Sequence, residues 1–123
     1  MELVYKNDKV KMQCTSVKAA KKLFGGNASL ATSLLARVNA LKNAKIIKDI
    51  IVIPNFHFHS LENKGRKILK GYYAIDVKTR KDAWRMILRL LDEKKEPYLD
   101  VGIDQIAEIV EIVEITEVSK QYE

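Results

Sequence analysis

The chain has 123 residues, of which 47% are hydrophobic, and it contains only five glycines and two prolines. This composition fits one globular domain over residues 1–123 and excludes a disordered chain. No apolar run approaches the ~18 residues of a membrane span, and residues 1–13 lack the apolar core of a signal peptide. The single cysteine, Cys14, suits a reducing compartment, so we expect a cytoplasmic protein that does not contact membranes.

The net charge of +6 is distributed unevenly along the chain. Residues 1–56 carry ten lysines and arginines against three acidic residues, residues 57–91 carry nine against three, and residues 92–123 carry three against ten. A basic field of this kind attracts RNA or DNA. A solvated lysine-rich surface explains the same charges equally well, so charge alone does not choose between the two.

The first part of the chain predicts a strand followed by two helices. Residues 2–6 alternate weakly and are a candidate edge strand. Ser16 is a candidate N-cap of a helix that ends at a glycine pair, and Asn27 or Ser29 is a candidate N-cap of the next helix. Because the loop between them is short, the two helices should form an antiparallel hairpin. The β-branched run IIKDIIVIP follows and stops at Pro54.

The middle of the chain predicts three strands. NFHFHSL alternates strictly, so its two phenylalanines share one face and His57 and His59 share the other. GYYAIDVK alternates in the same way, and AWRMILRLL places Arg85 on the face opposite Trp84 and Met86. We therefore expect the Arg85 side chain to leave the core, and Arg85→Ala to cost less than ~1 kcal/mol of stability.

The last segment, AEIVEIVEITEV, repeats every three residues, which suits neither a helix nor a strand. Its isoleucines and valines favour a strand, while its glutamates tolerate a helix. We expect a short helical or irregular piece near residues 103–108, and then a strand from about Val110 to Val118. The whole pattern predicts an α+β fold, with the N-terminal helical hairpin packed on a mostly antiparallel sheet.

Several residues of the middle segment are candidates for acid–base or phosphate chemistry. Imidazole titrates near neutral pH, which makes His59 an acid–base candidate, whereas His57 is more simply explained as an exposed strand residue. No third ligand stands near this pair in the sequence, so we expect neither a metal nor another cofactor. The guanidinium of Arg85 suits a phosphate, and a salt bridge across the sheet to Glu111 or Glu114 is the alternative.

Two basic segments flank GYYAIDVK. ENKGRK is a glycine-containing turn whose backbone amides and side chains can hold a phosphate. KTRKDAWR adds further cations directly before the next strand. Many surface loops have this composition, so each segment is a weak signal when taken alone.

In their order and spacing these motifs resemble the HigB branch of the RelE/ParE superfamily, the toxins of bacterial toxin–antitoxin modules. The resemblance covers about residues 11–122, and AAKKLFG and LLARVNAL look like the helical hairpin of its chromosomal members. The other matching segments are His59-Ser60-Leu61, Lys64-Gly65-Arg66, Gly71-Tyr72-Tyr73-Ala74-Ile75 and Trp84-Arg85-Met86. The chain departs from the pattern in a longer basic loop, a longer insertion before the last strand, and EVSKQYE in place of a closing Asp-Tyr-His.

The resemblance implies a RelE-like fold and a ribosome-dependent, metal-independent endoribonuclease that cuts mRNA and arrests translation. In such a reaction the 2′-OH attacks the adjacent phosphorus, cations stabilise the phosphoryl oxygens, and side chains transfer the protons. The resemblance implies catalytic roles for His59, Arg66 and Arg85. It implies RNA or phosphate binding by Lys64, Lys67, Arg80 and Tyr72. The possible further acid–base residues are Glu117, Lys120 and Tyr122.

The partners that the resemblance implies are the ribosome, mRNA and a HigA-type helix-turn-helix antitoxin. The antitoxin would either cover the basic face with acidic groups or bind the helices and block ribosome entry by its bulk. Two other functions stay open at this point. One is a ParE-like toxin with the same fold that inhibits a topoisomerase without RNA chemistry, and the other is a basic nucleic-acid-binding domain.

Overall fold

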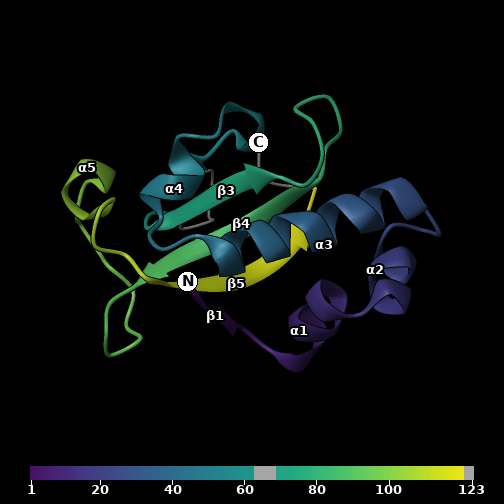
Figure 1. Ribbon diagram of the computed structural model, residues 1–123, viewed down its shortest axis with the longest axis horizontal. Coiled ribbons are helices and arrows are strands. Elements are labelled where there is room, and N and C mark those ends of the chain that lie inside the picture. Colours follow the sequence, from purple (N-terminus) through teal and green to yellow (C-terminus); the bar gives the residue numbers. More distant parts are fainter. Residues whose placement is uncertain (63–68, 121–123) are drawn as a thin grey trace.

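The computed structural model describes residues 1–62 and 69–120 and has an α+β fold, as predicted (Figure 1). The predicted site residues Lys64, Arg66, Lys67 and Tyr122 lie outside the described residues. The elements in chain order are β1 (Glu2–Tyr5), α1 (Asp8–Thr15), α2 (Val17–Leu23), α3 (Ala28–Asn43), α4 (Lys48–Ile51), η1 (Pro54–Phe56), β2 (His59–Ser60), β3 (Tyr72–Asp76), β4 (Arg85–Leu91), α5 (Ile103–Ile106) and β5 (Ile112–Ser119).

The strands form one sheet in the order β1-β5-β4-β3-β2. β1 pairs with β5 in parallel, and the other neighbours in the described sheet are antiparallel. β1 lies at one edge, as its weak alternation predicts, and the short strand β2 lies at the other. The sheet is therefore mostly antiparallel, and His59 lies on its β2 edge.

Side-chain caps explain where two of the helices begin. The Ser16 hydroxyl accepts a hydrogen bond from the Ala19 N–H at the start of α2, and the Asn27 side chain accepts one from Leu30 at the start of α3. The two glycines between these helices have positive φ angles, which residues with a side chain rarely adopt. The helix α1, which Asn7 caps, was not predicted from the sequence.

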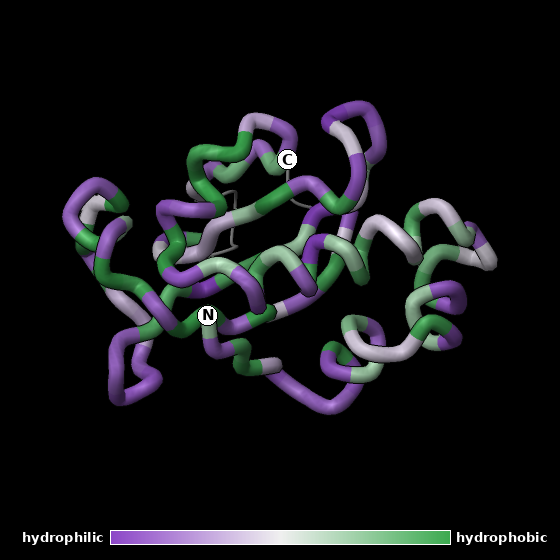
Figure 2. The backbone as a smooth tube through the Cα atoms, viewed as in Figure 1, coloured by the Kyte–Doolittle hydropathy of each residue, from purple (hydrophilic) through white to green (hydrophobic). Residues whose placement is uncertain are grey.

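The main core lies between the helices and one face of the sheet. In Figure 1 the long helix α3 lies over the sheet and runs nearly along β4 and β5, and in Figure 2 the hydrophilic residues gather in the loops at the rim. Buried side chains of α3 and of the alternating strand positions join in one cluster, which confirms the alternation predicted for β3 and β4. This cluster includes Leu34, Val38, Leu41, Ile75, Met86, Leu88 and Ile115.

The opposite face of the sheet carries a smaller apolar cluster. Leu61, Ala74 and Ile87 are buried there, and Leu69 and Tyr72 pack against them while remaining partly exposed. The strand register places His59, Arg89 and Glu117 on the same face as this cluster, so this second face of the sheet is where we look for a functional site. We call it the open face.

Two segments differ from their sequence patterns. NFHFHSL is not a continuous strand, because Pro54 starts the 3₁₀ turn η1 and His57 takes a left-handed conformation, so only His59–Ser60 pair as a strand. Phe56 and Phe58 nevertheless share one side, both packing into the main core. The β-branched run before Pro54 forms the short helix α4.

The C-terminal segment follows its prediction. The short helix α5 (Ile103–Ile106) comes first, and β5 (Ile112–Ser119) then pairs along the length of β4. Among the described residues, no helix combines the length and the apolar character that crossing a membrane would require.

Candidate functional site

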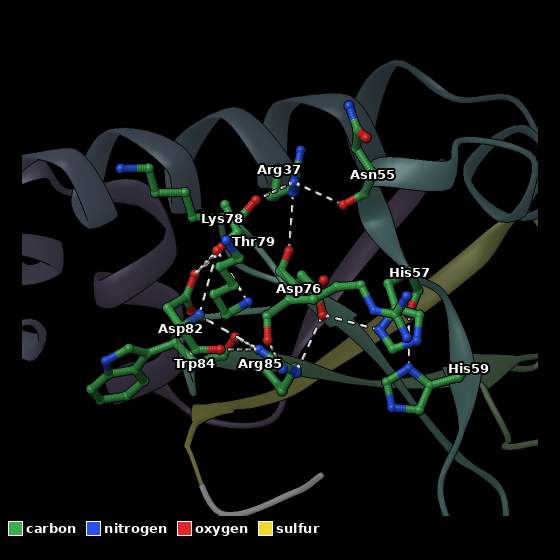
Figure 3. A network of polar contacts seen from close by, with 12 residues as sticks. Arg37, Asn55, His57, His59, Asp76, Lys78, Thr79, Asp82, Trp84 and Arg85 are labelled. Atoms are coloured by element: carbon green, nitrogen blue, oxygen red, sulfur yellow. Dashed lines mark hydrogen bonds and ion pairs between the residues drawn. The ribbon is translucent and has the colours of Figure 1, made fainter.

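Arg85, a predicted phosphate-binding residue, is buried in an ion pair. Its side chain is 6% exposed, and its Nε lies 3.2 Å from Oδ1 of Asp76, whose side chain is fully buried. The two residues are cross-strand neighbours on β4 and β3, on the open face (Figure 3). The expectation that Arg85 leaves the core is therefore wrong, although its placement opposite Met86 is right. Its partner is Asp76 rather than Glu111 or Glu114.

Arg85 is hidden because the β3–β4 connection folds over it. Its Nη1 donates to the carbonyl oxygens of Asp82 at 2.7 Å and Trp84 at 2.8 Å, and its Nη2 donates to that of Arg80 at 3.2 Å. The Asp82 carboxylate holds this connection by accepting hydrogen bonds from the backbone N–H groups of Thr79 and Trp84. A guanidinium engaged in this way organises the fold and has little capacity left for a phosphate.

A second arginine ties the helix layer to the same site. From α3, Arg37 donates hydrogen bonds to the carbonyl oxygens of Asp76, Lys78 and Asn55, at 3.0, 3.1 and 3.3 Å. Its guanidinium also lies 4.1 Å from the ring centroid of Phe56. Burial lowers the pKa of Arg37, and the nearby carboxylate of Asp76 opposes that shift. Arg37 thereby fixes the end of β3 against η1, which leads into His57.

The two histidines lie side by side next to this network (Figure 3). Nδ1 of His57 lies 3.4 Å from Oδ1 of Asp76, and Nδ1 of His59 lies 2.8 Å from the carbonyl oxygen of His57. Their ring centroids are 4.5 Å apart, and the rings are tilted by 31°. The His57 side chain is 33% exposed, so the pair is reachable from solvent.

The remaining predicted residues stand at different distances from His59. His59, Ala74, Ile87 and Glu117 are successive register partners across four strands. Three strand spacings separate His59 from Glu117, which is roughly 14 Å. Lys120 lies with its Nζ 5.7 Å from the ring centroid of Trp84, whose side chain packs against the main core. The structure therefore does not bring Glu117 or Lys120 next to His59.

Two predicted RNA-binding residues stay accessible. The Arg80 side chain is exposed even though its carbonyl oxygen accepts from Arg85. Tyr72 is half-buried on the open face, and the guanidinium of Arg89 lies 5.1 Å from its ring centroid. Arg89 therefore adds a cation to this face, and the sequence motifs had not predicted a role for it.

The sequence reasoning also missed the roles of His57 and Asp76. Asp76 is the one acidic residue in the otherwise apolar and aromatic strand YYAID, and a carboxylate inside a buried strand signals a built polar contact. His57 was set aside because strict alternation made it an exposed strand residue. Its left-handed backbone, with φ 50° and ψ 49°, turns it toward Asp76 instead.

A cavity of 530 Å³ opens beyond the end of β2. Its lining includes Ser60, which directly follows His59, together with Gly71 and the aromatic residues Tyr73 and Tyr98. Tyr73 also stacks on Phe58, with ring centroids 5.1 Å apart. Neither histidine is among its described lining residues, and Tyr73 and Tyr98 give the cavity aromatic walls.

Within residues 1–62 and 69–120, no group of three or more His, Cys, Asp or Glu side chains is arranged to hold a metal ion. A scan against protein-family models, a search of curated proteins and a search of solved structures each found no match to this chain. Function is therefore inferred from the site's geometry and from the resemblance in its motifs.

Proposed function

We propose that the chain is the toxin of a type II toxin–antitoxin module and a metal-independent endoribonuclease that cuts mRNA on the ribosome. The fold class agrees with that expected for a HigB-like member of the RelE/ParE superfamily. The chemistry requires a group that moves protons and cations that stabilise a phosphoryl group, and both are present on or beside the open face.

The observation that carries the proposal is the arrangement of His59. A carbonyl oxygen can only accept, so the Nδ1 that faces the carbonyl of His57 must bear the proton. When the ring is neutral, the lone pair of His59 is then on Nε2, which has no partner among the described residues. A neutral imidazole fixed in this tautomer on an accessible edge strand is suited to take a proton from a 2′-OH.

Cations and aromatic rings near His59 support RNA as the substrate. Arg89 and Tyr72 lie on the same face, and an exposed Arg80 follows the end of β3. An arginine can neutralise phosphates, and a tyrosine can stack on an unpaired base. The roles of Lys64, Arg66 and Lys67 remain predictions of the resemblance. Arg85 contributes by holding the site together, and its predicted contact with phosphate is withdrawn.

The partner in this proposal is a HigA-type antitoxin, a small helix-turn-helix protein. The ParE-like alternative shares the fold class but needs no accessible imidazole, so the geometry of His59 favours the nuclease. A plain nucleic-acid-binding domain likewise has no use for a fixed histidine tautomer. The three functions differ in what they stop first in a growing cell, so an experiment in cells separates them.

The experiment is induction of the chain in a bacterial host, with amino-acid and thymidine incorporation followed in parallel. The nuclease should stop amino-acid incorporation first, and co-expression of the cognate antitoxin should restore it. His59→Ala should lose most of this effect while its melting temperature stays close to that of the parent. Early loss of thymidine incorporation with DNA breaks would instead support the ParE-like function. Normal growth on induction would leave only the binding domain.

A further inference from the structure

His57 has a backbone conformation that is uncommon for a residue other than glycine. It follows the 3₁₀ turn η1, its φ and ψ are 50° and 49°, and its N–H donates to the carbonyl oxygen of Pro54 at 3.0 Å. Left-handed residues with a side chain are strained, and such strain gathers at functional sites. Here the conformation aims the His57 ring at Asp76 rather than along the edge of the sheet.

The carboxylate that faces His57 is more than a partner for Arg85. Both Nε of Arg85 and Nδ1 of His57 approach the same oxygen, Oδ1, at 3.2 and 3.4 Å. The other oxygen, Oδ2, is buried and has no hydrogen-bond partner among the described residues. A buried acceptor without a partner needs an explanation. If Asp76 served only the ion pair with Arg85, it would not need the partly exposed His57 ring beside it.

The contact with Asp76 also sets the tautomer of His57. An ionised carboxylate only accepts hydrogen bonds, so Nδ1 carries a proton. Nε2 then holds the lone pair when the ring is neutral, and it has no partner in the described part of the chain. A distance of 3.4 Å is long for a hydrogen bond, and catalytic hydrogen bonds often tighten only when the substrate is bound. His57 and His59 are thus two adjacent imidazoles that each place a proton on Nδ1, and both leave Nε2 available to take or give a proton.

We propose that His57 is the second acid–base group of the RNA-cleaving site and that Asp76 is its positioning residue. This inference rests on the proposed nuclease function and fills a role for which the described candidates of the closing segment, Glu117 and Lys120, do not lie next to His59. Glu117 lies three strands from His59, and Lys120 lies against Trp84. His57 is in ring contact with His59.

In the proposed reaction one imidazole takes a proton and the other gives one. Nε2 of the neutral imidazole takes the proton of the 2′-OH, and O2′ forms a bond to the adjacent phosphorus. The bond from phosphorus to O5′ breaks, and the other ring, present as imidazolium, gives its Nε2 proton to O5′. The products are a 2′,3′-cyclic phosphate and a 5′-OH end. One ring has gained a proton and the other has lost one, so exchange with water resets the pair.

The test is the rate of mRNA cutting in a purified ribosome assay, measured as a function of pH for variants of His57. His57→Asn is the sharpest change, because asparagine tolerates the left-handed conformation and keeps an N–H donor near the position of Nδ1 while removing Nε2. Cutting should fall about 10²–10⁴-fold, the usual contribution of one acid or base. The parent should show a bell-shaped pH profile, and His57→Asn should lose one of its limbs.

Two further variants separate an effect on the reaction from an effect on folding. His57→Gly removes the ring and relieves the positive φ, so it should fold well and cut as poorly as His57→Asn. In Asp76→Asn one limb of the pH profile should move, an effect that a purely structural role would not produce. Asn55→Ala is the matched control, because only the backbone of Asn55 is used in the network, and it should cut like the parent.

The outcomes separate this inference from the proposed function. If the parent cuts mRNA and folded His57→Asn and His57→Gly cut it at the parent's rate with both limbs intact, the role of His57 is overturned and the nuclease stands. If the parent does not cut mRNA, the proposed function falls and the inference falls with it. A double His57→Asn, His59→Asn variant should cut mRNA only slightly more slowly than the less active of the two single variants, since the two rings act as one unit.

Discussion

Replacing Arg85 with alanine should strongly destabilise this protein. The guanidinium is buried, and its removal leaves the fully buried Asp76 carboxylate without its positive partner. It also leaves three backbone carbonyl oxygens of the β3–β4 connection without a donor. Breaking a buried pair by removing one partner costs about 3–5 kcal/mol. For a chain of this length such a loss lowers the melting temperature by about 10–20 °C.

The assay is thermal and urea unfolding of the parent, Arg85→Ala and a matched control. Arg80→Ala is the control, because it removes an exposed arginine from the same connection and should change stability by less than ~0.5 kcal/mol. Arg85→Lys should lie in between, since an ammonium keeps the charge but cannot reach all the acceptors of the planar fork. If Arg85→Ala melts within ~2 °C of the parent, Arg85 is a surface residue and the buried network is wrong.

Three further changes test other parts of the structure. Burial raises the pKa of the Cys14 thiol to about 12 from 9.0, so the folded state holds this proton more tightly than the unfolded chain. Stability should be complete below pH 9 and fall as the pH rises toward 12, and urea unfolding below and above pH 9 should show a smaller fall for Cys14→Ala. Asn27→Ala should cost about 1 kcal/mol by removing the cap of α3, seen as a lower urea midpoint. Gly71→Ala should cost about 1–2 kcal/mol through strain at φ 85° rather than through a clash, since the nearest atom to an added Cβ is 3.5 Å away; an unchanged melting temperature would contradict the turn.

Elements that are determined by residues close together in the sequence could be predicted from it. The caps at Ser16 and Asn27 act within three residues, and the alternation of β3 and β4 follows from the geometry of one strand. The short helix α1 was missed even though Val10 and Cys14 stand four residues apart and are both buried, because two apolar positions make a weak pattern.

The surroundings of the site depend on contacts between distant segments, which the sequence does not display. Alternation places Arg85 opposite Met86, but it cannot tell whether that face meets water or the folded β3–β4 connection. The pairing of Arg85 with Asp76 follows from the register of two strands. His57 was misjudged for a related reason, since one left-handed residue after Pro54 is enough to end the alternation on which its exposure was predicted.

The most direct test of the central claim is the chemistry of the RNA ends. Purified protein is incubated with ribosomes programmed with an mRNA, with chelator added at a level that leaves the ribosomes intact, and His59→Asn serves as the inactive control. If the chain is this nuclease, the cuts should require the ribosome and carry a 2′,3′-cyclic phosphate and a 5′-OH. Intact mRNA in the presence of folded protein, or cuts with a 5′-phosphate that disappear on chelation, would contradict it.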